Sequence, residues 1–81
     1  MSNIEIKKVW EGRMGFNQVP VYEGYVNGNL VVFSRLKWLS RKVAEAVEAG
    51  HIEGTGDTVA RFAMWAGKND RASFDRMPES I

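Results

Sequence analysis

The chain has 81 residues, which is enough for one domain and too few for a separate catalytic domain. It contains no cysteine and one histidine, so disulfides, thiolate metal sites and histidine clusters are excluded, and we expect no metal or other cofactor. The net charge is only +1, but residues 1–42 carry seven Lys or Arg against three acids, whereas residues 43–81 carry four against seven. Such a split can orient a partner or a second copy, and it equally fits two solvated faces.

We expect residues 1–81 to form a single cytoplasmic domain with frayed ends at residues 1–3 and 79–81. The N-terminus lacks the basic-then-apolar order of a secretory signal. The apolar runs, such as Leu30 to Phe33, are far shorter than the roughly 20 residues that cross a bilayer, so no membrane span is expected. A hydrophobic fraction of 44% argues against disorder.

An alternating pattern at residues 4–10 predicts a first β-strand, and the alternation slips by one before Val9. We interpret the slip as a bulge near Lys7-Lys8, because paired lysines at a bulge are typical of an edge strand. Residues 11–18 contain two glycines and end in polar side chains, which predicts a loop.

A β-hairpin is predicted from two runs of β-branched and aromatic residues, 19–26 and 30–34, joined at Asn27-Gly28. A turn at Gly28-Asn29 would instead change every cross-strand pair of the hairpin, and the pattern leaves this alternative open. With Asn27-Gly28 as the turn, the expected pairs are Val26–Asn29, Tyr25–Leu30, Gly24–Val31 and Tyr22–Phe33. One face would then carry Tyr22, Val26, Val31 and Phe33, and the other Tyr25, Leu30 and Val32.

From Ser34 the apolar period changes to that of a helix over residues 35–49. Ser34 can serve as its N-cap, and Gly50 as the C′ residue that ends it. An alternative extends the strand through Trp38 and starts the helix at a Ser40 cap. The apolar stripe expected to face the core is Leu36, Leu39, Val43, Ala46 and Val47.

A second helix is predicted over residues 59–66, capped by Asp57 or Thr58 and ended by Gly67. Its apolar stripe is Val59, Phe62, Ala63 and Ala66. Asp70 can cap one more short turn that carries Phe74 and is stopped by Pro78. The predicted fold class is therefore α+β, with a three-stranded antiparallel sheet of residues 4–10, 19–26 and 30–34 packed by two C-terminal helices.

Trp38 is the most informative candidate for a binding site. It lies about 160 to 200° from the apolar stripe of its helix, among Arg41, Lys42 and Glu45. A solvent-facing tryptophan beside basic residues has the composition of an interface hot spot. The competing interpretation is that residues 70–81 fold over the ring, because large aromatic side chains are seldom left bare.

Four large apolar residues, Met14, Phe16, Met64 and Trp65, also lack an obvious core position. Irregular packing can bury any one of them. Together they predict an exposed apolar patch, and such patches mark binding sites or aggregation hazards.

The basic residues Arg35, Lys37, Arg41 and Lys42 surround Trp38 and suggest nucleic-acid binding as an alternative function. The sequence pI of about 8.1 is lower than the pI of about 9 or more expected of a dedicated nucleic-acid domain. Four charges on the outer side of a helix are more simply a solvated face.

No motif predicts an enzyme. The run Gly54 to Thr58 precedes a helix as a phosphate-binding turn does, but it matches no nucleotide fingerprint, and Asp57 would repel a phosphate. No pattern in the sequence places a serine and an acid together with His51. The carboxylates at 45, 48, 53 and 57 are more simply interpreted as helix-surface and capping groups.

A short cysteine-free chain with a strand, a hairpin around VYEGYVNGNLVVFSRLKWL and C-terminal helices resembles small phage-encoded accessory proteins. Several such families, among them the anti-CRISPR proteins and phage inhibitors of host polymerase, bind and block a host or defence complex. The resemblance implies an inhibitory role and assigns no functional residue.

We therefore predict a non-enzymatic protein-interaction module that binds and blocks a larger protein or complex. A nucleic-acid-binding accessory protein and a structural homo-oligomer, beginning with a homodimer, are the alternatives. The residues predicted for the protein-interaction surface are Arg13, Met14, Phe16, Trp38, Arg41 and Lys42.

Overall fold

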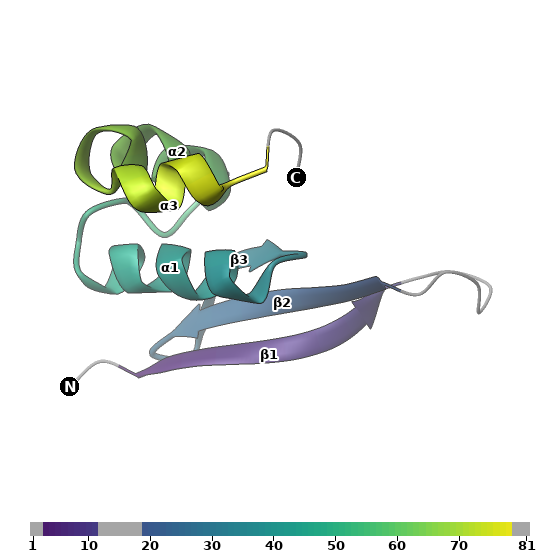
Figure 1. Ribbon diagram of the computed structural model, residues 1–81. Helices are drawn as coiled ribbons and strands as arrows, with labels where there is room; N and C mark the ends of the chain where they lie inside the picture. The colour runs from purple at the N-terminus through teal and green to yellow at the C-terminus, as the bar shows by residue number, and fades with distance from the viewer. Residues whose placement is uncertain (1–2, 12–18, 79–81) are drawn as a thin grey trace.

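The computed structural model describes residues 3–11 and 19–78, which form three layers (Figure 1). An antiparallel sheet in the order β1-β2-β3 is covered on one face by α1, and α2 and α3 lie on the far side of α1. This arrangement confirms the predicted α+β class and its three-stranded antiparallel sheet. The elements are β1 Ile4–Glu11, β2 Val19–Val26, β3 Asn29–Ser34, α1 Lys37–Glu48, α2 Thr58–Asn69 and α3 Arg71–Arg76.

The core lies on both sides of α1. Leu39 and Val43 of the predicted stripe are fully buried, with Val26 and Val32 of the sheet on one side and Phe62 of α2 on the other. Because α1 is the middle layer, its buried surface is wider than one stripe and also includes Ser40 and Ala44.

The predicted hairpin turn is confirmed at Asn27-Gly28. Both residues have positive φ, 52° and 84°, as a type I′ turn requires. The two pairs next to the turn, Val26–Asn29 and Tyr25–Leu30, are also as predicted.

Beyond these two pairs, the predicted register is wrong, because the β2–β3 ladder shifts between Gly24 and Tyr25. Gly24 pairs with Val32 instead of Val31, so Val31 is the additional residue of a bulge. The shift exchanges the faces of the residues that follow. Val32 therefore packs in the core with α1, while Phe33 pairs with Glu23 on the opposite face.

The bulge predicted at Lys7-Lys8 is also wrong. β1 pairs with β2 in unbroken register from Ile4–Val26 to Glu11–Val19. The slip in the apolar pattern has another cause. Val9 pairs with Val21 on the face away from α1, so it serves a different face from Ile6.

α1 begins at Lys37, later than predicted, and neither serine caps it. Its N-cap position is Leu36, which makes no side-chain capping bond. The predicted end is confirmed. Gly50 has a φ of 82°, and the bonds Gly50 N–H to Val47 C=O and His51 N–H to Ala46 C=O form a Schellman motif.

Asp57 caps α2 as predicted, accepting a hydrogen bond from the Ala60 amide at 3.2 Å. The predicted stop at Gly67 is wrong, because α2 continues to Asn69. A Cβ at Gly67 would lie 3.6 Å from the Phe74 ring, an ordinary contact distance, so α3 packs beside Gly67 without requiring a glycine there.

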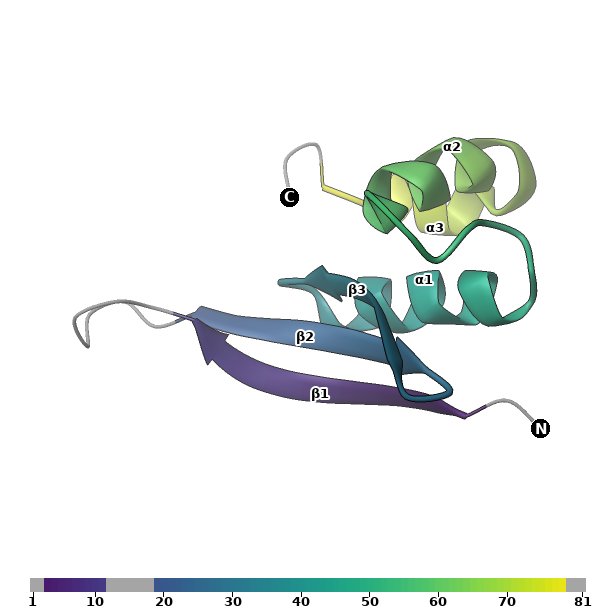
Figure 2. The same cartoon turned by 180° about the vertical axis from the view of Figure 1, so that it is seen from behind.

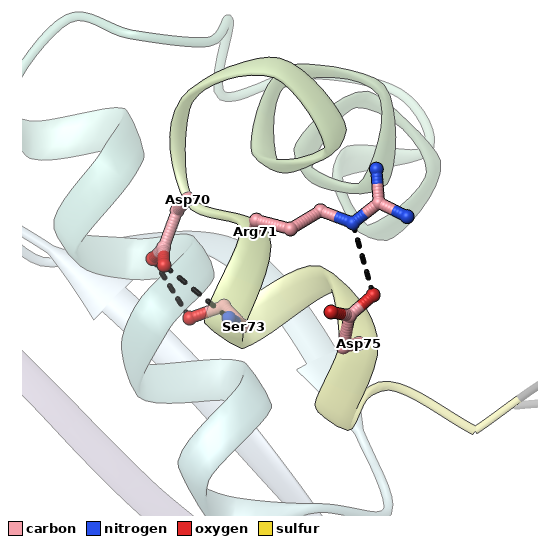
Figure 3. A network of polar contacts seen from close by, with 4 residues as sticks. All are labelled: Asp70, Arg71, Ser73 and Asp75. Carbon is pink, nitrogen blue, oxygen red and sulfur yellow. Dashed lines mark hydrogen bonds and ion pairs between the residues drawn. The ribbon is translucent and has the colours of Figure 1, made fainter.

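The short turn predicted after Asp70 is the helix α3. Asp70 Oδ1 accepts a hydrogen bond from the Ser73 amide at 3.3 Å, and its other carboxylate oxygen accepts one from the Ser73 hydroxyl at 2.7 Å (Figure 3). Arg71 and Asp75 form an ion pair on the outer side of the same helix. The helix ends before Pro78, as predicted.

Candidate protein-interaction surface

One face of the sheet has no helix packed against it, because α1, α2 and α3 all lie on the other side (Figures 1 and 2). Cross-strand partners have their side chains on the same face of the sheet, so the strand pairings show which residues lie on the open face. The described residues that lie on it are Glu5, Lys7, Val9, Glu11, Val19, Val21, Glu23, Tyr25, Leu30 and Phe33, of which Val21 is buried.

The centre of this open face is polar and internally satisfied. Lys7 Nζ lies 5.0 Å from the centre of the Tyr25 ring, and the Tyr25 hydroxyl donates a 2.9 Å hydrogen bond to Glu23 Oε1. Because the neutral hydroxyl donates to the carboxylate, this bond raises the pKa of Tyr25. The three side chains therefore partner one another on the middle of the sheet.

The β3 side of the open face is apolar and uncovered. Leu30 is 47% exposed and Phe33 is 65% exposed, although both are large hydrophobic residues. They pair with Tyr25 and Glu23, so they form the outer column of the face. Two such neighbours on an edge strand are unusual for a surface that contacts only water.

A groove of about 960 Å³ runs beside β3, between this strand and the N-terminal part of α2. Leu30 and Phe33 belong to its wall as well as to the open face. Among the described residues that line it, Asp57 is the one with a charge. The apolar side chains that line the groove are Leu30, Val31, Val32, Phe33, Val59, Ala60, Ala63, Met77 and Pro78. We call this groove together with exposed Leu30 and Phe33 the β3-edge surface.

Thr58 limits what the β3 edge can bind. Its Oγ1 donates a 2.7 Å hydrogen bond to the carbonyl oxygen of Val31, the bulged residue of β3. An added strand would need free backbone groups along this edge. With the Val31 carbonyl already bonded, the β3-edge surface offers side-chain contacts more than strand pairing.

The predicted site around Trp38 differs from the prediction in one respect. Trp38 is partly buried against the core, and the Arg76 guanidinium of α3 lies 4.3 Å from its ring centre. Arg76, within the segment 70–81 of the competing interpretation, therefore covers this ring. Arg41 and Lys42 are exposed beside it, as expected for the outer side of α1. The other predicted members, Arg13, Met14 and Phe16, lie outside the described residues.

The basic residues predicted for nucleic acid, Arg35, Lys37, Arg41 and Lys42, are all exposed. Arg76 occupies the position over Trp38 that a stacked base would take.

The remaining apolar candidates are dispersed. Met64 is 77% exposed on α2 and makes no groove contact, and Trp65 stacks on His51 with ring centres 4.6 Å apart. This stack gives His51 a packing role. Within residues 3–11 and 19–78, no group of three or more His, Cys, Asp or Glu side chains is placed to hold a metal ion. No helix in the same ranges is long and apolar enough to cross a bilayer.

Sequence reasoning missed Leu30 and Phe33, because the pattern within the hairpin does not show which of its two apolar faces the helices cover. A signal was nevertheless present. The hairpin has apolar residues on both faces, and all the predicted helical segments follow it in a short chain. When they pack together on one face, the apolar residues of the other face remain open.

No protein-family model matches the chain, and no curated protein or solved structure is significantly similar to it.

Proposed function

We propose that this protein is a non-enzymatic interaction module that binds a larger protein through the β3-edge surface. The observation that carries the proposal is Phe33, which is 65% exposed beside an apolar groove. Exposing an aromatic ring to water costs free energy that a partner recovers by covering it. Fully desolvated aromatic residues in pockets commonly dominate the binding energy of protein interfaces.

The chemistry of the groove indicates what kind of partner surface it can bind. Its lining is apolar apart from Asp57 and the neutral threonines, and the Val31 carbonyl is already bonded to Thr58. The partner therefore inserts apolar side chains from a folded surface or a helix. Binding of this kind can block the covered surface of the partner, which is the inhibitory role that the resemblance to phage accessory proteins implies.

The experiment compares capture of proteins from the native host by the wild type, Phe33→Ser and Met64→Ser, with identification by mass spectrometry. Met64 is the matched control, because it is also a large apolar side chain, is more exposed and does not line the groove. We expect wild type and Met64→Ser to retain the same partner and Phe33→Ser to lose it. With the purified partner, Phe33→Ser should weaken binding about 30-fold, the effect of a typical hot spot of about 2 kcal/mol.

Nucleic-acid binding is the second candidate, favoured by the exposure of all four predicted basic residues. Fluorescence anisotropy with single- and double-stranded oligonucleotides at low salt tests it. A steep loss of affinity with added salt, abolished by Arg41→Gln with Lys42→Gln, would support it. If Phe33→Ser leaves partner capture intact and the oligonucleotides bind, the second candidate replaces the first.

A further inference from the structure

The exposed side of α1 carries a stripe of four charges in the order plus, plus, minus, minus. Lys37, Arg41, Glu45 and Glu48 are all exposed. At about 100° per residue they fall within about 80° of one another around the helix. They therefore form one continuous face along the length of α1, which we call the α1 charge stripe.

This order of charges is unfavourable for α1 itself. Bases near the start of a helix and acids near its end oppose the helix dipole, and α1 has no acid in its first turn and no base in its last. Lys37 and Arg41 are like charges four residues apart, and Glu45 and Glu48 are like charges three residues apart. Each of these pairs repels, and the opposite charges of Arg41 and Glu45 between them form no ion pair.

The fold does not neutralise the stripe from elsewhere. Among the described side chains, the ion pairs are Arg61–Glu53 and Arg71–Asp75, and neither involves α1. Arg76 adds a further positive charge beside Trp38, at the basic end of the helix. Charges that disfavour their own helix and find no partner within the fold are expected where they serve binding.

We propose that the chain associates with a second copy of itself through the α1 charge stripe, with the two α1 helices antiparallel. The midpoint between Lys37 and Glu48 lies between residues 42 and 43, and the midpoint between Arg41 and Glu45 lies at residue 43. One two-fold axis at this point therefore places Lys37 opposite the second copy's Glu48 and Arg41 opposite its Glu45. The contact is isologous, so each pair forms twice.

The same arrangement removes both causes of instability in the stripe. Every repelled charge gains an opposite charge, and two antiparallel helix dipoles attract one another. A nucleic-acid strand fits less well. Phosphates running along α1 from Lys37 and Arg41 would meet the carboxylates of Glu45 and Glu48 within one to two turns.

The contact should be weak, because each exposed ion pair contributes little binding free energy and is screened by salt. We therefore expect a dimer at low ionic strength and high protein concentration that dissociates on addition of salt. Sedimentation equilibrium over a concentration series measures its dissociation constant.

Two single charge reversals and their combination test the pairing. In Arg41→Glu the facing positions 41 and 45 both carry acids, and in Glu45→Arg both carry bases, so each variant should dimerise at least tenfold more weakly, which is about 1.4 kcal/mol. The double variant Arg41→Glu with Glu45→Arg restores opposite charges at both positions and should restore the dimer. An equimolar mixture of the two single variants should form a heterodimer.

Two controls make the result specific. Lys68→Glu reverses an exposed base on α2 and should leave the dimer unchanged, and circular dichroism confirms that each variant is folded. A wild type that stays monomeric at low salt and high concentration overturns the proposal. So does a double variant or a mixture that remains monomeric, because the assigned pairing requires both rescues. Phe33→Ser should dimerise normally, which separates this proposal from that of the β3-edge surface.

Discussion

Ser40 of α1 donates a 2.7 Å hydrogen bond from its hydroxyl to the backbone carbonyl of Tyr22 in the central strand. The Ser34 hydroxyl, at the end of β3, lies 2.7 Å from the Ser40 hydroxyl. Both serines are buried, so these bonds form where water cannot replace them. A single small polar cluster therefore fixes the start of α1 against two strands of the sheet.

Replacing Ser40 by alanine should destabilise the fold. The substitution removes the hydroxyl that bonds the Tyr22 carbonyl and lies against the Ser34 hydroxyl, and a buried polar group that loses its partner costs about 1–3 kcal/mol. Chemical denaturation measures the change in the free energy of unfolding. Lys42→Ala, an exposed substitution on the same helix, is the control, expected within about 0.5 kcal/mol of wild type. Equal stabilities for the two variants would show that the cluster contributes nothing.

The sequence could predict elements whose signals are local. Asn27-Gly28 specifies a type I′ turn through positive φ at both residues, and Gly50 specifies the end of α1 in the same way. The bulge at Val31 was not predictable, since the Val31 carbonyl bonds Thr58, 27 residues away in sequence. Missing it reversed the faces of Val32 and Phe33.

The candidate site was harder to predict for the same reason. Exposure of Trp38 depends on where α3 places Arg76, and exposure of Phe33 depends on which sheet face the helices cover. Neither is determined by a periodicity within one element. The charge stripe of α1 was visible in the sequence, but its lack of ion pairs emerged only from the structure.

Two glycine-to-alanine substitutions should change stability in opposite directions. A Cβ at Gly24 would lie 2.6 Å from Val32 Cγ1 and 3.3 Å from the Ser40 carbonyl, so Gly24→Ala overpacks the sheet–α1 contact. We expect a loss of about 1–3 kcal/mol. At Gly67 the nearest atoms, in the Phe74 ring, lie at an ordinary contact distance of 3.6 Å. Gly67→Ala should stabilise α2 by up to about 1 kcal/mol through helix propensity.

Thermal denaturation of both glycine variants at one protein concentration gives the comparison. A Gly24→Ala protein as stable as wild type would mean that β2 and α1 can separate without cost. A destabilised Gly67→Ala protein would mean that the Phe74 ring cannot accept the added methyl group.

Asp70 should make the stability of the protein depend on acid pH. The hydroxyl and then the amide of Ser73 donate hydrogen bonds to its carboxylate, and they hold its pKa below the ordinary value (Figure 3). A lowered folded-state pKa means that the stabilisation is complete above the unfolded pKa, about 3.9. It is lost as the pH falls from there through the folded pKa.

Melting temperatures of the wild type and Asp70→Asn across this acid range should converge as the pH falls. In a carboxyl NMR titration, Ser73→Ala should raise the pKa of Asp70, because it removes the donor with the largest effect. An unchanged titration in Ser73→Ala would exclude the hydroxyl as the cause.

Thr58 should protect the β3 edge from pairing with other chains. Thr58→Val keeps the shape of the side chain and removes the hydroxyl that bonds the Val31 carbonyl, so we expect a loss of about 0.5–1.5 kcal/mol. The released carbonyl adjoins exposed Leu30 and Phe33, and an apolar edge strand with free backbone groups promotes association. Light scattering should therefore detect concentration-dependent association of Thr58→Val that persists at high salt, unlike pairing through the α1 charge stripe. Thr58→Ser retains the hydroxyl and should behave as wild type; association of both variants alike would show that the hydroxyl by itself does not account for the protection.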